Sequence, residues 1–247
     1  MATWRRYEEL RPDELATCVS QTPVVFWPLG LLEHHGWHLP VGFDGMKAER
    51  MCMRMAEQTG GVLLPTMWWG GGGGHDMFHW TFYQDESAYT QILVETTQKL
   101  IAYGFRAIVI LAGHYPWRKT LEERLPEIRE AHPEILLLFG TEVTIVGDAV
   151  NVKGDHAAKE ETSYGLSLFP ERIDMDAMRS GRGDEVWPNR TPPPEDRRHS
   201  RVRFDPNDPL FAQMGEDSRE ASAAHGEAGV LQVVNEVVAR IQRHLGG

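Results

Sequence analysis

Four short apolar runs predict the buried strands of a sheet. They are PVVFW (23–27), VLLPT (62–66), RAIVILAG (106–113) and ILLLF (135–139). The third run is apolar throughout, which is typical of strands that are covered on both faces, as in parallel sheets. Pro28 and Gly30 close the first run.

Helical patterns alternate with these runs. Good helix formers fill the segment from about 45 to 58, and apolar residues fall on one helical face over 89–103. Further helices are predicted over about 118–131 and 157–168, and the last helix carries apolar residues at helical spacing from Val230 to Ile241. We expect this helix to pack on its own sheet, with an interface role as the alternative. Alternating strands and helices predict an α/β fold with three layers, α/β/α, around a mostly parallel central sheet.

Two segments interrupt the alternation. Residues 68–80 contain five consecutive glycines, which no regular element holds, so we expect a loop. Residues 179–209 are rich in Pro, Arg and Asp, which indicates a long surface excursion or a lid. Because no repeat or domain boundary is visible, we expect one domain over 1–247.

Composition narrows the function. The 247 residues are 41% apolar and 25% charged with a net charge of -11, which argues against a nucleic-acid partner. Cys18 and Cys52 lie far apart, so neither a disulfide framework nor a thiolate zinc site is expected. Because no secretory signal and no apolar run of ~20 residues is visible, we expect a cytoplasmic protein without a membrane partner.

Metal-binding side chains follow two of the predicted strands. Glu33 and His35 come after the first strand, His114 comes after the third, and Asp44 stands at the start of a helix, where it could both cap and ligate. Because ligands bind at the carboxyl ends of parallel strands, we expect these four side chains to converge. Carboxylates with imidazoles suit zinc, manganese or iron(II), and Asp44 could bridge two ions.

Four ordered motifs resemble those of the creatininase family. PLGLLEHHGWHLPVGFD (28–44) is similar to its opening signature, and GGGGGHDMFHWTFY (70–83) to its glycine-rich loop. AGHY (112–115) is followed by GDHAAKEETS (154–163) and EASAAHGEAG (220–229), which are similar to later family segments. The resemblance spans most of the chain and implies a creatininase-like α/β fold.

The resemblance also implies an activity and its residues. The family consists of metal-dependent amidohydrolases, so it implies hydrolysis of a non-peptide C–N bond in a cyclic or small amide by a metal-activated water, with two divalent ions. The implied ligands are Glu33, His35, Asp44 and His114. Tyr115 would contact substrate, and His156 would act as general acid or base, held by Asp155 or Glu161.

One position departs from the pattern. Creatininase has a glutamate ligand two residues after the histidine that corresponds to His114, and Pro116 stands there in this chain. Glu161 could supply the missing oxygen and so join the metal ligands as well as the catalytic residues. The alternative is one tightly held ion and one weakly held ion.

Several other side chains near these motifs have more than one interpretation. His34 is expected at the surface or behind the ligands, and His38 as a hydrogen-bond partner rather than a ligand. One of His75 and His79 is expected to face the substrate and the other the solvent; His75 is our candidate. Asp155 and Trp187 complete the candidate substrate contacts, with Trp187 as a closing lid over a flat ring.

Three rival functions stay open. Within the family they are a formamide deformylase and a peptidase of peptide-cofactor maturation. A third is a catalytically degenerate, metal-stabilised binding or scaffold protein, because Pro116 departs from the family pattern. The family resemblance further implies a homo-oligomer built from dimers, up to a hexamer.

Overall fold

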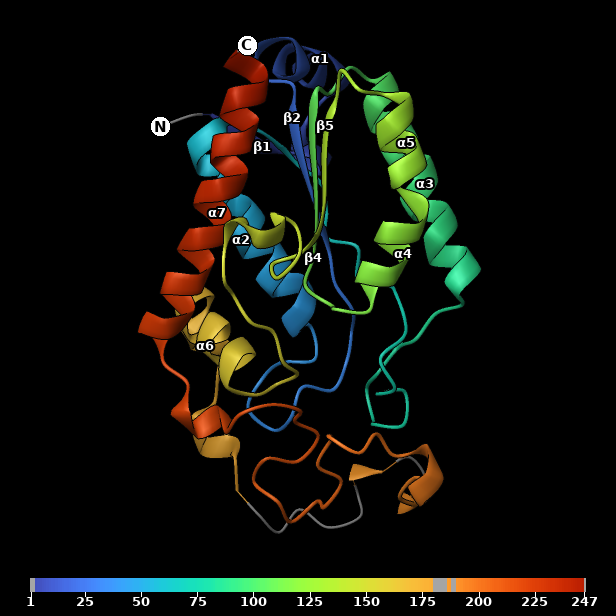
Figure 1. The fold of residues 1–247 in the computed structure, drawn as a ribbon, viewed down its shortest axis with the longest axis vertical. Helices are drawn as coiled ribbons and strands as arrows, with labels where there is room; N and C mark the ends of the chain where they lie inside the picture. Colours follow the sequence, from blue (N-terminus) through green and yellow to red (C-terminus); the bar gives the residue numbers. More distant parts are fainter. Residues whose placement is uncertain (1–2, 180–185, 188–189, 247) are drawn as a thin grey trace.

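A five-stranded parallel sheet forms the centre of the protein (Figure 1). The computed structural model describes residues 3–179, 186–187 and 190–246. Within them the strand order is β1-β3-β2-β4-β5, and each of the four strand pairings is parallel. The strands are β1 (Trp4–Arg6), β2 (Val24–Leu29), β3 (Gly61–Leu63), β4 (Ala107–Ala112) and β5 (Leu136–Thr141).

Helices cover both faces of this sheet, which confirms the predicted three-layer α/β fold (Figure 1). On one face lie α2 (Phe43–Thr59), α6 (Lys159–Leu168) and α7 (Ala223–Gly246). On the other lie α1 (Pro12–Gln21), α3 (Glu86–Ala102), α4 (Trp117–Arg124) and α5 (Pro126–Ala131). Short 3-10 helices are η1 (Tyr7–Glu9), η2 (Gly147–Ala149), η3 (Pro170–Arg172), η4 (Met175–Ala177), η7 (Glu195–Arg197) and η8 (Ser218–Glu220).

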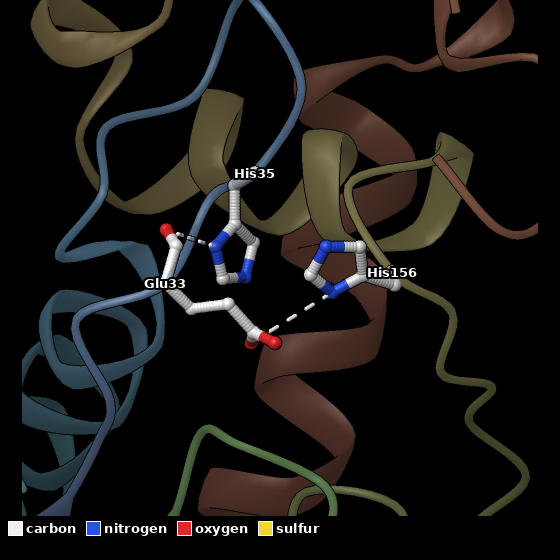
Figure 2. Close-up of side chains that lie close together, drawn as sticks. All are labelled: Glu33, His35 and His156. Atoms are coloured by element: carbon white, nitrogen blue, oxygen red, sulfur yellow. Dashed lines mark hydrogen bonds and ion pairs between the residues drawn. The ribbon is translucent and has the colours of Figure 1, made fainter. Parts of the chain in front are cut away.

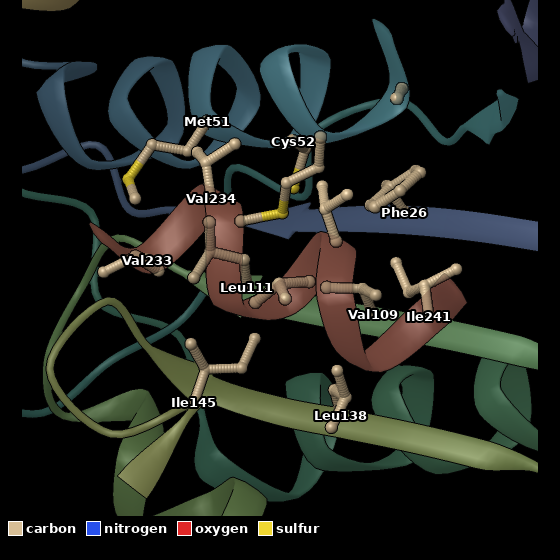
Figure 3. Packing of buried hydrophobic residues seen from close by; sticks show 14 of the residues in the cluster. Phe26, Met51, Cys52, Val109, Leu111, Leu138, Ile145, Val233, Val234 and Ile241 are labelled. Carbon is tan, nitrogen blue, oxygen red and sulfur yellow. The ribbon is translucent and has the colours of Figure 1, made fainter. Parts of the chain in front are cut away.

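Alternate residues of each central strand enter the two cores. In β2, Val24 and Phe26 pack towards α2 and α7, whereas Val25 and Trp27 pack towards α3 and α4. Figure 3 shows the first of these cores, in which the strands lie beneath Cys52 of α2. The apolar residues of α7 from Val230 to Ile241 are buried there, so that stripe packs on its own sheet.

The structure corrects several predicted boundaries. The helix expected over 118–131 is two helices, because Pro126 has no amide hydrogen to continue α4 and instead begins α5. The third helix begins at Glu86, where the Asp85 side chain accepts a hydrogen bond from the Ser87 amide. Both β1 and α1 were missed, since three strand residues and a charged helix give little periodic signal.

The connections bring two loops together at the carboxyl ends of β2 and β4. These strands are neighbours, with Leu29 opposite Ala112. The helix that follows β2 covers one face and the helix that follows β4 covers the other, so this edge is the point at which the chain direction switches, where open α/β sheets usually bind ligands. Described parts of 179–209 lie beyond this edge (Figure 1); residues 180–185 and 188–189 fall outside the described chain, and the lid role stays a prediction.

The described helices include none with the length and apolar character needed to cross a bilayer.

Candidate metal centre

Side chains from five segments meet at this edge of the sheet. Glu33 and His35 follow β2, and Asp44 lies in the first turn of α2. His114 follows β4. His156 and Glu161 come from the start of α6 and the segment before it. The six side chains are at least 93% buried, so the predicted convergence is what the structure shows.

Glycines allow the segments to approach so closely. A Cβ on Gly30 would lie 2.4 Å from the Cα of Gly45, and a Cβ on Gly113 would lie 2.0 Å from the carbonyl oxygen of Asp44. Any larger residue at either place would push the start of α2 away from the sheet. Asp44 can therefore reach both the Glu33 and the His114 loops.

Two sets of donors share Asp44. The Glu33 half consists of Glu33, Asp44 and His114: His114 Nδ1 lies 3.0 Å from Glu33 Oε2 and 3.2 Å from Asp44 Oδ2. The Glu161 half consists of His35, Asp44 and Glu161: His35 Nε2 lies 3.1 Å from Asp44 Oδ1 and 3.7 Å from Glu161 Oε2. In each set the donor atoms lie within 4.8 Å of one another. Asp44 thus has the position of a bridge.

Backbone carbonyls fix the imidazoles. His35 Nδ1 donates to the carbonyl of Glu33 at 3.0 Å, and His114 Nε2 donates to that of Gly72 at 3.2 Å. His156 Nε2 donates to the carbonyl of His34 at 3.0 Å. The second nitrogen of each ring then faces the carboxylates, which is the orientation that such second contacts give to metal-bound histidines. Figure 2 shows His35 and His156 side by side, with the Glu33 carboxylate below them.

These donors fit a divalent cation. Glu33 Oε2 and Asp44 Oδ2 are buried and make no hydrogen bond of regular geometry within the described part of the chain; their nearest polar neighbour is His114 Nδ1, itself a candidate ligand. A buried carboxylate oxygen without a donor is costly unless a cation meets it. Two carboxylates with one imidazole suit zinc, manganese or iron(II), so the residues present fit the predicted metal.

Electrostatics lead to the same conclusion. Burial lowers the pKa of His35 and His114, but the adjacent carboxylates outweigh it and raise the pKa of His35 to about 9 and that of His114 to about 10. The reverse holds for Glu33 and Asp44: burial opposes ionisation, yet the imidazoles hold the pKa of each carboxyl below its usual range. In the metal-free protein, protons therefore occupy the imidazole nitrogens to which a divalent ion would bind.

Two predicted local contacts are wrong. Asp44 does not cap α2, whose N-cap Gly42 has no side-chain hydrogen bond, because both Asp44 oxygens face the imidazoles instead. Neither Asp155 nor Glu161 holds His156, whose partner is the His34 carbonyl. Asp155 accepts hydrogen bonds from the amides of Glu160 and Glu161 and so stabilises the start of α6.

The side chains of His34 and His38 contact residues other than the candidate ligands. His34 is buried rather than at the surface, since its ring packs against Trp37, Phe78 and Phe211. His38 is a hydrogen-bond partner as predicted, but of Thr162 Oγ1 at 2.8 Å rather than of a ligand.

His75 is the histidine of the glycine-rich loop that faces the centre. Its Nδ1 lies 3.6 Å from Glu33 Oε1, and its ring lies 3.9 Å from that of His156, whereas His79 is half-buried. Trp187 is 1% exposed and packs on Phe78, which stacks on His75. The indole is therefore one aromatic ring removed from His75. The substrate roles of His75 and Trp187 stay predictions.

Lys47 and Glu142 are site residues that the sequence analysis missed. Lys47 Nζ donates to Glu142 Oε1 at 2.7 Å and to Glu161 Oε1 at 2.8 Å, and all three side chains are buried. Tyr115, the predicted substrate contact, donates its hydroxyl to Glu142 at 2.6 Å and partly lines a surface cavity of about 300 Å³. Pro116 packs near Gly72 and Gly73 and offers no ligand atom.

Comparison with known proteins decides the family. The family model described as "Creatininase: Creatinine amidohydrolase" matches residues 8–241. The chain belongs to the creatininase family. This confirms the predicted family and the prediction of an amidohydrolase, a hydrolase of carbon–nitrogen bonds other than peptide bonds.

Two known hydrolases are similar to the chain at low sequence identity. A creatinine amidohydrolase of Pseudomonas putida is 26% identical over 197 residues, which cover 71% of this chain and 73% of that protein. A 3-dehydro-scyllo-inosose hydrolase of Thermotoga maritima is 23% identical over 180 residues, which cover 67% of this chain and 56% of that protein.

Solved structures share the fold. A creatininase crystal structure has a TM-score of 0.72 at 23% identity and covers 96% of both chains. A mutant creatininase described as "Zn-Zn type" has a TM-score of 0.71 at 22% identity over 98% of both chains. A structure described as "Creatininase Mn" has a TM-score of 0.72, at the same identity and coverage.

Proposed function

We propose that this creatininase-family protein is a metal-dependent hydrolase of a small or cyclic amide. The observation that carries the proposal is the group of three tethered imidazoles around buried carboxylates, in which Glu33 Oε2 and Asp44 Oδ2 meet only a nitrogen of the same group, His114 Nδ1. A divalent ion bound there would lower the pKa of a coordinated water towards ~7 and polarise the substrate carbonyl.

The chain's own residues supply the rest. His156 Nε2 is fixed by the His34 carbonyl, so its Nδ1, 4.0 Å from Glu33 Oε2, is the nitrogen that can accept and return a proton. Burial holds the pKa of His156 well below its ordinary value, so the ring is neutral and ready to accept. This proton would pass to the departing amide nitrogen.

His75 has a matching position for the substrate. Its ring lies 3.9 Å from that of His156, and its Nε2 is buried without a hydrogen-bond partner in the described chain. Burial lowers the pKa of His75 to about 3, so the ring is neutral. We assign it to hydrogen bonding with the amide, with Tyr115, Asp155 and Trp187 as outer contacts.

The test is removal and return of the metal. Chelator-treated protein should lose hydrolysis, and zinc, manganese or iron(II) should restore it, on a panel of creatinine, other cyclic amides, formamides, short peptides and 3-dehydro-scyllo-inosose. Full activity in metal-free protein would refute the proposal. Bound metal without turnover of any substrate would favour the scaffold alternative.

A histidine pair supplies the control. His156→Gln should lower kcat by roughly 10²–10⁴-fold with metal content retained, whereas His132→Gln, in the connection before β5 where the side chain is 39% exposed, should change neither. The predicted dimer-based homo-oligomer, cytoplasmic location and single domain over 1–247 belong to the same proposal, and light scattering tests the first.

A further inference from the structure

A buried lysine stands on one side of the candidate centre. Lys47 is fully buried in α2, one helical turn after Asp44, and its ammonium contacts the Glu142 and Glu161 carboxylates. The ring of Tyr115 lies beneath it, 4.5 Å from Nζ to the ring centroid. Because an unpaired ammonium is costly to bury, these two carboxylates hold Lys47 in its charged form in place.

The two halves of the centre differ in what already binds their oxygens. In the Glu33 half, the nearest polar partner of Glu33 Oε2 and Asp44 Oδ2 is His114 Nδ1, at 3.0 and 3.2 Å, and this nitrogen is itself one of the candidate ligands. In the Glu161 half, Lys47 donates to Glu161 Oε1, and the Ala157 amide donates to Glu161 Oε2 at 2.8 Å. A cation in the Glu33 half would therefore replace only a contact between its own ligands, whereas in the Glu161 half it would have to share Glu161 with Lys47 and the Ala157 amide.

We propose that Lys47 makes the centre unequal: the Glu33 half holds a divalent ion tightly, and the Glu161 half holds a second one weakly. The Lys47 ammonium already supplies positive charge to Glu161, so it opposes a second cation and competes for the same carboxylate. This inference rests on the proposed metal-dependent function, but it concerns the ratio of two affinities rather than the presence of metal.

A metal titration of the whole protein tests it. Metal-free protein is titrated with manganese or cobalt by calorimetry, and ions retained after gel filtration are counted by mass spectrometry. We expect wild type to retain one ion and to bind a second at least about tenfold more weakly. Two equally tight ions in wild type would overturn the inference while leaving the proposed function intact; no ion at all would overturn both.

Variants then test whether Lys47 causes the difference in affinity. Lys47→Met with Glu142→Gln removes the ammonium without leaving Glu142 charged and unpaired, and should tighten the second ion roughly tenfold or more, a change of the size that contacts outside the ligands produce. Glu142→Gln alone and Lys119→Met, at an exposed lysine, should leave it weak. If the double variant bound the second ion no more tightly than wild type does, Lys47 would only hold Glu161 in place. That result would overturn the inference.

Discussion

The clearest quantitative prediction concerns the metal-free protein at rising pH. In its folded state the pKa of His35 is raised from 6.5 to about 9 and that of His114 from 6.5 to about 10, with Asp44 and Glu33 as the contacts responsible. Since a raised pKa means that the folded state binds the proton more tightly, this stabilisation is complete below pH 6.5. It disappears as the pH rises through the folded-state values.

The size follows from the shifts. A pKa difference of one between the folded and unfolded states corresponds to about 1.4 kcal/mol. His35 therefore contributes on the order of 3 kcal/mol, and His114 on the order of 5 kcal/mol, to the free energy of unfolding at low pH. The lowered pKa values of Asp44 and Glu33 describe the same contacts and are not added. Compared with a typical unfolding free energy of ~5–15 kcal/mol, the expected loss between pH 6.5 and 10 is large.

Urea denaturation in chelator, followed by tryptophan fluorescence at pH 6.5, 8 and 9.5, measures this loss. The metal-loaded protein should show a flatter profile, because an ion replaces the protons. Asp44→Asn should also flatten the metal-free profile, since it removes a carboxylate from both imidazoles. A metal-free wild type whose unfolding free energy stays constant or rises over this range would refute the electrostatic reasoning.

Three further predictions test the centre and its support. Asp44→Asn should weaken metal binding more than ~100-fold, beyond what outer contacts contribute, and counting of bound ions checks this; near-normal metal content would contradict the bridging role. Gly113→Ala should cost about 1–3 kcal/mol in urea because its Cβ would meet the Asp44 carbonyl oxygen, whereas Gly246→Ala, with open space around its Cβ, should be neutral, and equal stabilities would contradict the close approach. Thr162→Val should cost about 1–3 kcal/mol by leaving His38 Nε2 buried without its partner, and an unchanged urea midpoint would count against that bond.

The sequence was enough to predict the donors at the sheet edge. Apolar runs locate β2 and β4, and residues just after parallel strands must meet, so Glu33, His35 and His114 could be grouped without coordinates. His156 and Glu161 follow no strand directly. Only the family motif identified these two as candidate site residues, because the segment before α6 has no regular secondary structure from which their position could be predicted.

Lys47 and Glu142 were not predicted as site residues, although the sequence carries a signal for each of them. Glu142 directly follows β5, so the rule that identified His114 also applied to it. Lys47 stands among buried residues of α2, such as Ala48 and Met51, where a charge is unusual. Neither signal reveals the contact between them, because a hydrogen bond across 95 positions depends on how α2 packs over the sheet. The His34 carbonyl as partner of His156 is unpredictable for the same reason.

The most direct test of the metal centre is anomalous diffraction from crystals grown with zinc or manganese, collected on either side of the metal's absorption edge. We expect a strong peak in contact with Glu33 Oε2, Asp44 Oδ2 and His114 Nδ1. A hydrolytically active crystal form with no peak among these three atoms would contradict it.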